Sequence, residues 1–462
     1  MKKRNLLLGF WGLFLSGMLM ACTSGGAGVE ETASTDKTEA VPTRPPATAA
    51  RIATAVSTPV ETPVETSIPA TETEPGEQPF DKWSLWSGGT QLRGANIYQR
   101  RVFEEIDGLE FVGPGPFGPP YTQEDFDHLR ALGANYVNFS VAGLYTVEPP
   151  YRVDEQAAAN LDRLLEMAAE ADLYAVITFR SGPGRSEFSI LGAADWYPRS
   201  YLIESVWTEP AAQAAWAAMW RYTAERYLGS QVVVGYDLMC EPNSNGILDI
   251  WDAGEFYDQY GGSGYDWNTW YPPIVEAIRS VDADTPILVS GLSFGDIAWL
   301  PYVEMVEDER LVYTFHQYNP HEYSHQEPAA DPEYIYPGEF DTDYDGEAER
   351  CDRSWLEQLF SIAVDWMGEH SRPLAVNEYG AVRWAPGAAQ YLRDQMELFE
   401  QHGWNYAIWM WYPAWEPLKE GDNSFNYRLG ADPNNLDDLA STDILETLID
   451  FWRRNAKGLL KP

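Results

Sequence analysis

The chain has few cysteines and little positive charge for its length. Only three of its 462 residues are cysteine: Cys22, Cys240 and Cys351. Three are too few for a disulfide framework, so we expect Cys240 and Cys351 to be free thiols. Lysine and arginine together number 31, against 71 aspartates and glutamates. This acidic excess argues against nucleic acid and anionic lipid as partners, and it suits a neutral substrate.

Long apolar runs are also missing, apart from one at the start. The basic residues 2–4 precede an apolar run over residues 6–20, which is too short for a spanning helix and is typical of an export signal. Its end, Leu19-Met20-Ala21-Cys22, resembles a lipobox. We therefore expect residues 1–22 to be a lipoprotein signal peptide, with acylated Cys22 anchoring an extracellular protein to the bacterial cell membrane. An ordinary signal peptide with an incidental cysteine is the alternative.

Residues 23–79 have almost no aromatic or bulky apolar side chains and consist mainly of threonine, proline, glutamate, serine and alanine. Such a segment cannot bury enough surface to offset its ordering entropy. The composition predicts a disordered tether that holds a folded module, residues 80–462, away from the membrane.

The module contains eight short β-rich runs, and all but the fifth are followed by an amphipathic helical pattern. This alternation predicts an α/β fold with a parallel sheet, and eight units favour closure into a (β/α)8 TIM barrel. No Gly-x-Gly-x-x-Gly sequence opens a helix, which counts against a dinucleotide-binding fold. The expected strands are Leu92–Asn96, Tyr136–Ser140, Tyr174–Phe179, Val232–Met239, Ile287–Ser290, Val312–Phe315, Leu374–Val376 and Tyr406–Trp411.

Two glutamates stand where strands of such a barrel end. Glu241 follows the fourth expected strand, and Glu378 follows the seventh. Either one alone could be a solvated loop residue. The carboxyl ends of the strands form the active face of a TIM barrel, so the two side chains should meet across its mouth. Glycoside hydrolysis needs such a pair, one carboxyl protonated and one ionised.

At these residues the chain resembles glycoside hydrolase family 5 and its clan of barrel enzymes. The resemblance rests on Cys240-Glu241-Pro242, on Glu378-Tyr379-Gly380, and on Arg93-Gly94-Ala95-Asn96, His316-x-Tyr318 and Trp409-Met410-Trp411. It implies a retaining hydrolase of β-linked poly- or oligosaccharides, with Glu241 as acid/base and Glu378 as nucleophile. The carboxyl groups should then lie about 5–5.5 Å apart. No cofactor is expected.

The resemblance also assigns roles to neighbouring side chains. His316 and Tyr318 would line the cleft, with Tyr318 hydrogen-bonded to the nucleophile, although His316 could instead be a core histidine. Trp411 would be the platform for the sugar being cleaved. Strand alternation sends Trp409 to the same face, so periodicity does not choose between these two tryptophans. Trp415 and Trp299 are further candidates for sugar contacts.

Three residues depart from the family pattern. Cys240 replaces the asparagine that hydrogen-bonds the sugar's 2-hydroxyl, and a thiol is a weaker donor and acceptor. Asn138 stands where an arginine is usual, and Arg180 where the third strand usually ends in histidine. Arg180 could supply the missing positive charge from the neighbouring strand. These departures keep open a second hypothesis, a non-catalytic carbohydrate-binding surface lipoprotein on the same barrel.

A remote alternative is a zinc metallopeptidase. The sequence His321-Glu322-Tyr323-Ser324-His325 matches the His-Glu-x-x-His pattern. That chemistry needs both histidines on one face of a helix and a third ligand. Pro320 abuts the first histidine, so we expect no helix to run into the motif and place it in the loop after the sixth strand.

An acidic segment matches the first half of an EF-hand calcium loop. Its candidate ligands are Asp341, Asp343, Asp345 and Asp352, the last at the twelfth position. No helix is expected before it. Calcium bound here would hold a loop and take no part in chemistry.

Overall fold

The computed structural model describes residues 80–111, 113, 115–192, 197–342 and 346–455. The predicted signal peptide, its lipidation site Cys22 and the tether over residues 23–79 lie outside the described residues, as do Asp343 and Asp345. Among the described residues, no helix is both long and apolar enough to span a membrane.

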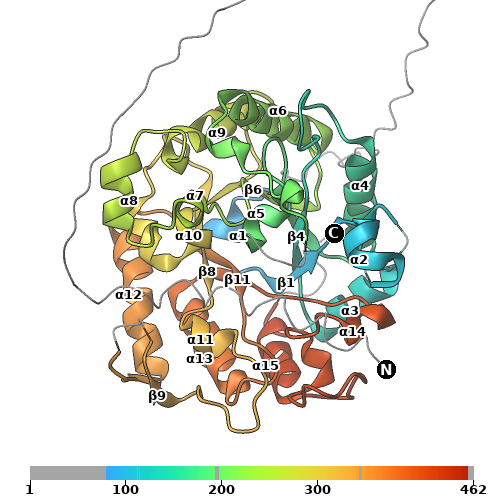
Figure 1. Ribbon diagram of the computed structural model, residues 1–462, viewed down its shortest axis with the longest axis vertical. Coiled ribbons are helices and arrows are strands. Elements are labelled where there is room, and N and C mark those ends of the chain that lie inside the picture. The colour runs from blue at the N-terminus through green and yellow to red at the C-terminus, as the bar shows by residue number, and fades with distance from the viewer. Residues whose placement is uncertain (1–79, 112, 114, 193–196, 343–345, 456–462) are drawn as a thin grey trace, which may run out of the picture.

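The core of the molecule is a closed barrel of eight parallel strands, which confirms the predicted TIM barrel (Figure 1). Going round the barrel, β1 is followed by β12, β11, β8, β7, β6, β5 and β4, which pairs with β1 again. The barrel strands are β1 (Arg93–Tyr98), β4 (Tyr136–Ala142), β5 (Tyr174–Ser181), β6 (Val233–Asp237), β7 (Ile287–Ser290), β8 (Leu311–Gln317), β11 (Leu374–Tyr379) and β12 (Asn405–Ile408).

Seven longer helices form an outer ring around the strands (Figure 1). They are α3 (Gln123–Leu132), α4 (Glu155–Glu170), α6 (Pro210–Arg226), α9 (Tyr271–Arg279), α12 (Arg353–His370), α13 (Ala388–His402) and α15 (Asp443–Trp452). The fifth unit, between β7 and β8, has the 3-10 helix η4 (Ile297–Tyr302) in this layer instead. Pro301 lies inside η4 and is incompatible with an α-helix interior.

The remaining elements are short and belong mostly to the loops. They are α1 (Ser84–Ser87), β2 (Arg100–Arg101), α2 (Glu104–Phe111), β3 (Phe117–Gly118), α5 (Phe188–Leu191), η1 (Arg199–Tyr201), η2 (Ser205–Trp207), α7 (Ser244–Leu248), α8 (Ala253–Tyr260), η3 (Trp267–Thr269), α10 (Leu292–Gly295), α11 (His321–Ser324), β9 (Gly338–Phe340), β10 (Glu349–Cys351), α14 (Glu416–Glu420) and η5 (Tyr427–Leu429).

Local sequence signals explain the helix boundaries. Asp154 caps α4, because its side chain accepts hydrogen bonds from the backbone of Gln156 and Ala157. Helix α3 begins with a capping box between Thr122 and Asp125. It ends at Gly133, whose φ of 115° is a conformation that a glycine adopts freely.

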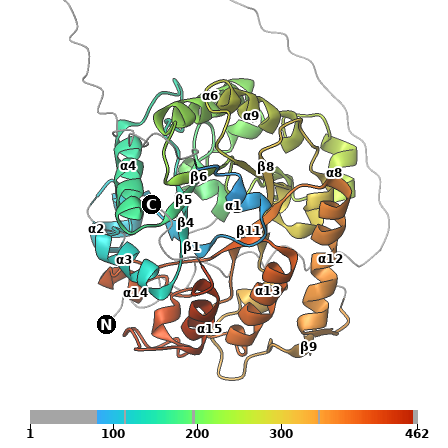
Figure 2. The same cartoon turned by 180° about the vertical axis from the view of Figure 1, so that it is seen from behind.

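The end of the barrel where the strands begin is closed by α1. The indole of Trp86 is buried there and donates a hydrogen bond to the carbonyl oxygen of Val234, at 2.9 Å. Around it lies an apolar cluster that includes Tyr136, Tyr174 and Leu288. Figure 2, which views the molecule from behind, shows α1 in the centre of this face. With this end plugged by a packed core, the other end is left for the functional side chains.

The eighth strand is shorter than predicted. The sequence favoured Tyr406–Trp411, but β12 ends at Ile408. The backbone of Trp409 still donates to Tyr379 and that of Trp411 to Asn96, but this stretch no longer pairs as a regular strand. Side-chain alternation therefore does not extend to the tryptophans, and they need not share a face.

Candidate active site

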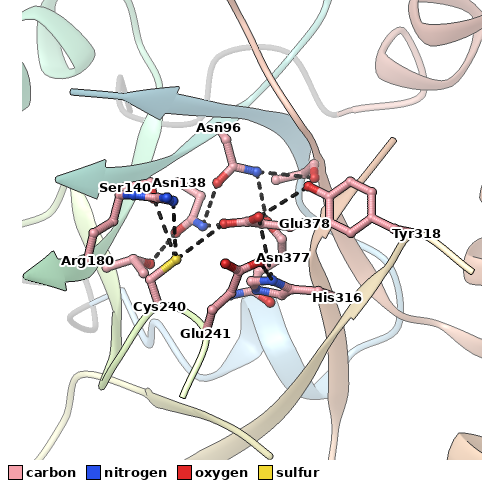
Figure 3. A network of polar contacts seen from close by, with 12 residues as sticks. Asn96, Asn138, Ser140, Arg180, Cys240, Glu241, His316, Tyr318, Asn377 and Glu378 are labelled. Atoms are coloured by element: carbon pink, nitrogen blue, oxygen red, sulfur yellow. Dashed lines mark hydrogen bonds and ion pairs between the residues drawn. The ribbon is translucent and has the colours of Figure 1, made fainter. Parts of the chain in front are cut away.

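Glu241 and Glu378 meet at the carboxyl ends of the barrel strands, as the sequence predicted (Figure 3). Glu378 lies within β11, and Glu241 lies four residues beyond the end of β6. One oxygen of each carboxylate and a ring nitrogen of His316 all lie within 4.8 Å of one another. This spacing fits the close carboxyl pair of a retaining glycosidase, at about 5–5.5 Å, and leaves less room than the inverting arrangement needs.

The backbone of Glu241 has an unusual conformation that a buried arginine holds in place. Its φ is 53°, in the left-handed region that non-glycine residues rarely adopt. The guanidinium of Arg185 donates to the carbonyl oxygens of Cys240 and Glu241, each at 2.7 Å. Strain of this kind persists where the surroundings over-determine the conformation, and it is common at active sites.

Glu378 receives hydrogen bonds on both carboxylate oxygens. Tyr318 donates its hydroxyl to Oε2 at 3.2 Å, and the thiol of Cys240 contacts Oε1 at 3.5 Å. The carboxylate is almost fully buried. Tyr318 therefore lies where the sequence placed it, beside the carboxylate expected to be the nucleophile.

His316 lies between the two carboxylates. Its Nδ1 is 3.1 Å from Glu241 and 3.5 Å from Glu378. Burial lowers the pKa of His316, but the charges of Glu378 and Glu241 outweigh burial and raise it to about 9. The side chain is thus cationic at neutral pH and belongs to the site; it is not an isolated core histidine.

The same contacts shift the pKa values of the two carboxyl groups. Burial raises the pKa of Glu378, with His316 opposing it and Glu241 adding to it. Burial also acts to raise the pKa of Glu241, but the hydrogen bond and charge of His316 outweigh burial and lower it. The two carboxyl groups are thus electrostatically unequal, and His316 contacts both of them.

A ring of polar side chains supports the carboxylates from inside the barrel. Asn138 donates to Asn96 at 2.8 Å, Thr178 donates to Asn138 at 2.8 Å and to Asp237 at 3.0 Å, and Asn377 donates to Asp237 at 2.6 Å. Asn138 therefore lies beneath the site and is engaged in this ring. Burial raises the pKa of Asp237 to about 7, against the charge of His316.

Arg180 lies near Glu378 and belongs to β5, the strand next to the one that carries Asn138. Its Nη1 lies 3.2 Å from Ser140 and 3.5 Å from the sulfur of Cys240, which in turn contacts Glu378. Its Nε donates to Glu187 at 3.0 Å. The sulfur of Cys240 thus lies between this buried cation and Glu378. The position of Arg180 supports the hypothesis that it replaces the charge missing at Asn138.

The role predicted for Trp411 is wrong. Its indole is buried in the helix layer, donates to the carbonyl oxygen of Asp125 at 3.0 Å and packs edge-on against Trp452. Trp409 instead borders the site, where its ring lies 5.4 Å from the guanidinium of Arg180 and 5.7 Å from Tyr98. The chain leaves the regular strand after Ile408, which separates the directions of the two side chains.

The other two tryptophan candidates lie outside the barrel strands, in η4 and next to α14. Trp299 is buried in η4, with its ring edge-on to Phe256 at 5.5 Å, so it offers no face to a sugar. Trp415 is partly buried at the start of α14, a helix that packs against α2.

The zinc motif lies in the loop after β8, as expected, although residues 321–324 form one helical turn, α11. The rings of His321 and His325 stack at 4.0 Å. No third ligand among the described residues joins them in a group that could hold a metal ion. Within the part of the chain that the structure describes, the one such group is Glu241, His316 and Glu378.

The described part of the acidic segment forms a hairpin. Strands β9 and β10 flank it, so no helix precedes it, as predicted. Asp341 accepts from the backbone of Gly346, and Asp352 caps α12 by accepting from Ser354. The calcium hypothesis stays a prediction. Cys240 and Cys351 are both free and buried, as expected.

Sequence reasoning missed several residues that shape the site: Asn96, Tyr98, Ser140, Thr178, Glu187, Asp237 and Asn377. Asn96, Thr178, Asp237 and Asn377 are polar residues inside otherwise apolar strands. An uncompensated polar side chain in a buried strand is costly, so such positions signal a partner or a function.

Comparisons with known proteins agree with this geometry. The family model described as "Cellulase (glycosyl hydrolase family 5)" matches residues 96–414. Endoglucanase C of Acetivibrio thermocellus is 19% identical over 315 residues, covering 62% of this chain and 83% of the relative. Cellodextrinase A of Ruminococcus flavefaciens is 26% identical over 282 residues, covering 60% and 72%. The crystal structure of endoglucanase Cel5A from Thermotoga maritima has the same fold, with a TM-score of 0.54 and 18% identity, over 80% of this chain and 100% of that one.

Proposed function

The chain belongs to glycoside hydrolase family 5 and is a retaining glycoside hydrolase that acts on β-glycans, and from this premise we propose that it cleaves β-linked glucan chains with Glu241 as acid/base and Glu378 as nucleophile. The observation that carries the proposal is the close approach of the two carboxylates at the barrel mouth, with their oxygens within 4.8 Å. The choice of glucan is supported by the names of the relatives, which include endoglucanases and a cellodextrinase.

The reaction proceeds in two displacements. Glu241 donates its proton to the glycosidic oxygen while a carboxylate oxygen of Glu378 attacks the anomeric carbon; the glycosidic bond breaks and a glycosyl-enzyme ester forms. Glu241, now ionised, takes a proton from water, and that water attacks the anomeric carbon and releases Glu378.

The surrounding residues prepare this chemistry. Tyr318, hydrogen-bonded to Oε2, fixes the orientation of the Glu378 carboxylate. His316 holds a proton within reach of Glu241. Cys240 occupies the position from which an asparagine would reach the 2-hydroxyl of the sugar, so we expect a weaker contact with that group.

The test is sugar release from a panel of β-glucans, mannans and aryl β-glycosides. We expect the wild type to cleave a β-glucan and Glu378→Ala to lose this activity by several orders of magnitude. Glu241→Ala should keep more activity on aryl glycosides with good leaving groups, because these need little protonation. Glu369→Ala, at an exposed position on α12, is the matched control and should behave as wild type.

One outcome of the panel favours the second hypothesis. If the wild type binds glycans but cleaves none, the chain is a non-catalytic carbohydrate-binding protein, and Cys240 and Asn138 mark a site that has lost its chemistry. The presence of both Glu241 and Glu378 favours hydrolysis, because each carboxylate has a hydrogen-bond partner that holds it in the site.

We also propose that the hydrolase is exported and held at the bacterial cell membrane through acylated Cys22. The support is the sequence of residues 1–22 and the composition of residues 23–79. A hydrolase of polymers too large to enter a cell has to work outside it.

A further inference from the structure

The loop after β8 carries a stacked pair of imidazoles that the proposed reaction does not use. The ring centroids of His321 and His325 are 4.0 Å apart, and the ring planes differ by 12°. His321 is the first residue of α11 and His325 caps its C-terminal end, and a spacing of four places two side chains on the same face.

Two aromatic side chains pack against this pair of imidazoles. On His325, the ring of Tyr318 packs edge-on at 5.1 Å and that of Phe425 at 5.5 Å. Tyr318 is the same residue that donates to Glu378. The stacked imidazoles and Tyr318 therefore form one continuous group of packed rings beside Glu378.

Hydrogen bonds hold α11 rigidly in this position. Ser324 donates its hydroxyl to the carbonyl oxygen of Tyr318 at 2.5 Å, and its own carbonyl oxygen accepts from the backbone of Val382 at 2.8 Å. The hydroxyl of Tyr323, a buried residue, donates to Pro386 at 3.1 Å. A surface that is already ordered loses little entropy when a ligand binds to it.

The outer ring of the stack, His321, is exposed to solvent, whereas His325 is partly buried. The surrounding protein nevertheless lowers the pKa of His321 by burial, and the charge of Glu241 partly offsets this. The ring is thus a flat, mainly neutral face, close enough to Glu241 for that carboxylate to act on its pKa.

Helix α11 lies on the Tyr318 side of Glu378. Cys240 contacts Oε1 of Glu378 and Tyr318 contacts Oε2, so Arg180 and Cys240 lie on one side of this carboxylate and Tyr318 on the other (Figure 3). Trp409 lies with Arg180, whereas α11 follows Tyr318. Glu241 protonates the departing oxygen, so the departing sugar has to lie next to Glu241.

We propose that His321 is the platform of the leaving-group subsite, on which the sugar unit released in the first displacement stacks. One face of a pyranose ring is lined with C–H bonds, and such a face packs well on a flat π-system. His325, Tyr318 and Phe425 keep the platform in place. The ligand class is a neutral pyranose of a β-linked chain, and the assignment rests on the proposed hydrolase activity.

The test compares two substrates that differ in what occupies this subsite. Cellotetraose places sugar there, whereas β-cellobiosyl fluoride places only a fluoride ion. We expect His321→Ala to lower kcat/KM on cellotetraose about tenfold, the loss of one good aromatic contact, and to leave kcat/KM on the fluoride unchanged. His321→Phe keeps a flat ring and should restore the activity on cellotetraose.

His402→Ala is the matched control, since His402 also stacks on an aromatic ring, that of Trp404, but lies at the end of α13. It should leave both substrates unaffected. Equal losses on both substrates for His321→Ala, or a His321→Phe variant as weak as His321→Ala, would overturn the platform. Wild-type protein that cleaves neither substrate would instead overturn the proposed function, and the subsite with it.

A second readout follows the glycosyl-enzyme itself. A sugar acceptor has to occupy the same subsite to intercept the intermediate in place of water. With β-cellobiosyl fluoride as donor and cellobiose as acceptor, His321→Ala should lower the ratio of transfer to hydrolysis about tenfold. An unchanged ratio would contradict the assignment.

Discussion

Individual residues around Glu378 show how the site accommodates its departures from the family pattern. Asn138 cannot provide charge, and its side chain is engaged with Asn96 and Thr178 beneath the site. Arg180 stands on the adjacent strand and reaches Cys240, which contacts the carboxylate. The arginine is held by Glu187 and lies over the rings of Tyr98 and Trp409. The positive charge near Glu378 is thus carried by Arg180 on β5, and not by the residue at position 138 on β4.

This arrangement predicts the pH profile of an Arg180→Met variant. The charge of Arg180 acts to lower the pKa of Glu378, so its removal raises that pKa further. As the proposed nucleophile, Glu378 has to be ionised, so the acidic limb of the kcat/KM profile should move to higher pH. Arg180→Lys keeps a charge and should move the limb less. Activity that falls equally at every pH would assign Arg180 a purely structural role.

The elements at the two ends of the barrel have different roles: those at one end fill the interior, and those at the other carry the ionisable groups. At the closed end, α1 and Trp86 fill the interior where the strands begin. At the open end, the last residues of β8 and β11 and the loop after β6 carry the ionisable groups. Stability and chemistry are therefore encoded by different segments, in keeping with other barrels of this kind.

This separation predicts the behaviour of Trp86→Ala. Truncation leaves a cavity in the plug and removes the hydrogen bond to Val234, so we expect a loss of about 3–5 kcal/mol in the free energy of unfolding. Urea denaturation measures it. Well below the transition, kcat should stay near the wild-type value. Leu228→Ala, at a side chain with 59% exposure, is the control and should change the stability little. A loss of kcat in the folded variant would show that the two ends are coupled.

Most of these elements could be predicted from the sequence, and the exceptions have physical causes. The barrel strands stand out because each is an apolar run between helical patterns. The end of β12 could not be placed, because residues 406–411 are apolar or aromatic throughout and contain no turn residue. Helix η4 was missed because Pro301 interrupts the amphipathic pattern that reveals the other helices.

The candidate site was predictable where a short motif carries the chemistry, as at Glu241, His316, Tyr318 and Glu378. It was not predictable where tertiary packing determines which side chains reach the site. Whether Trp409 or Trp411 faces the cleft depends on how the chain leaves β12. The role of Arg180 depends on Cys240 and Glu187, which local sequence does not bring together.

For the whole molecule, the proposed anchoring gives a direct prediction. In a bacterial host that acylates lipoproteins, the full-length chain should partition into the detergent phase and the membrane fraction. Cys22→Ser removes the thiol that carries the lipid, so this variant should partition into the aqueous phase. Cys351→Ser is the control, since a buried thiol of the module should not affect partitioning. Wild-type protein found wholly in the aqueous phase would contradict the anchor.

The plug formed by α1 also determines at which end of the barrel the described chain begins. The described chain begins at Phe80, whose ring stacks at 5.7 Å on Tyr174, the first residue of β5. The chain therefore enters the barrel at the end opposite Glu241 and Glu378. With the proposed anchor at Cys22, the tether would join the module at the end away from both carboxylates. A glycan chain would then reach Glu241 and Glu378 from the side opposite the attachment.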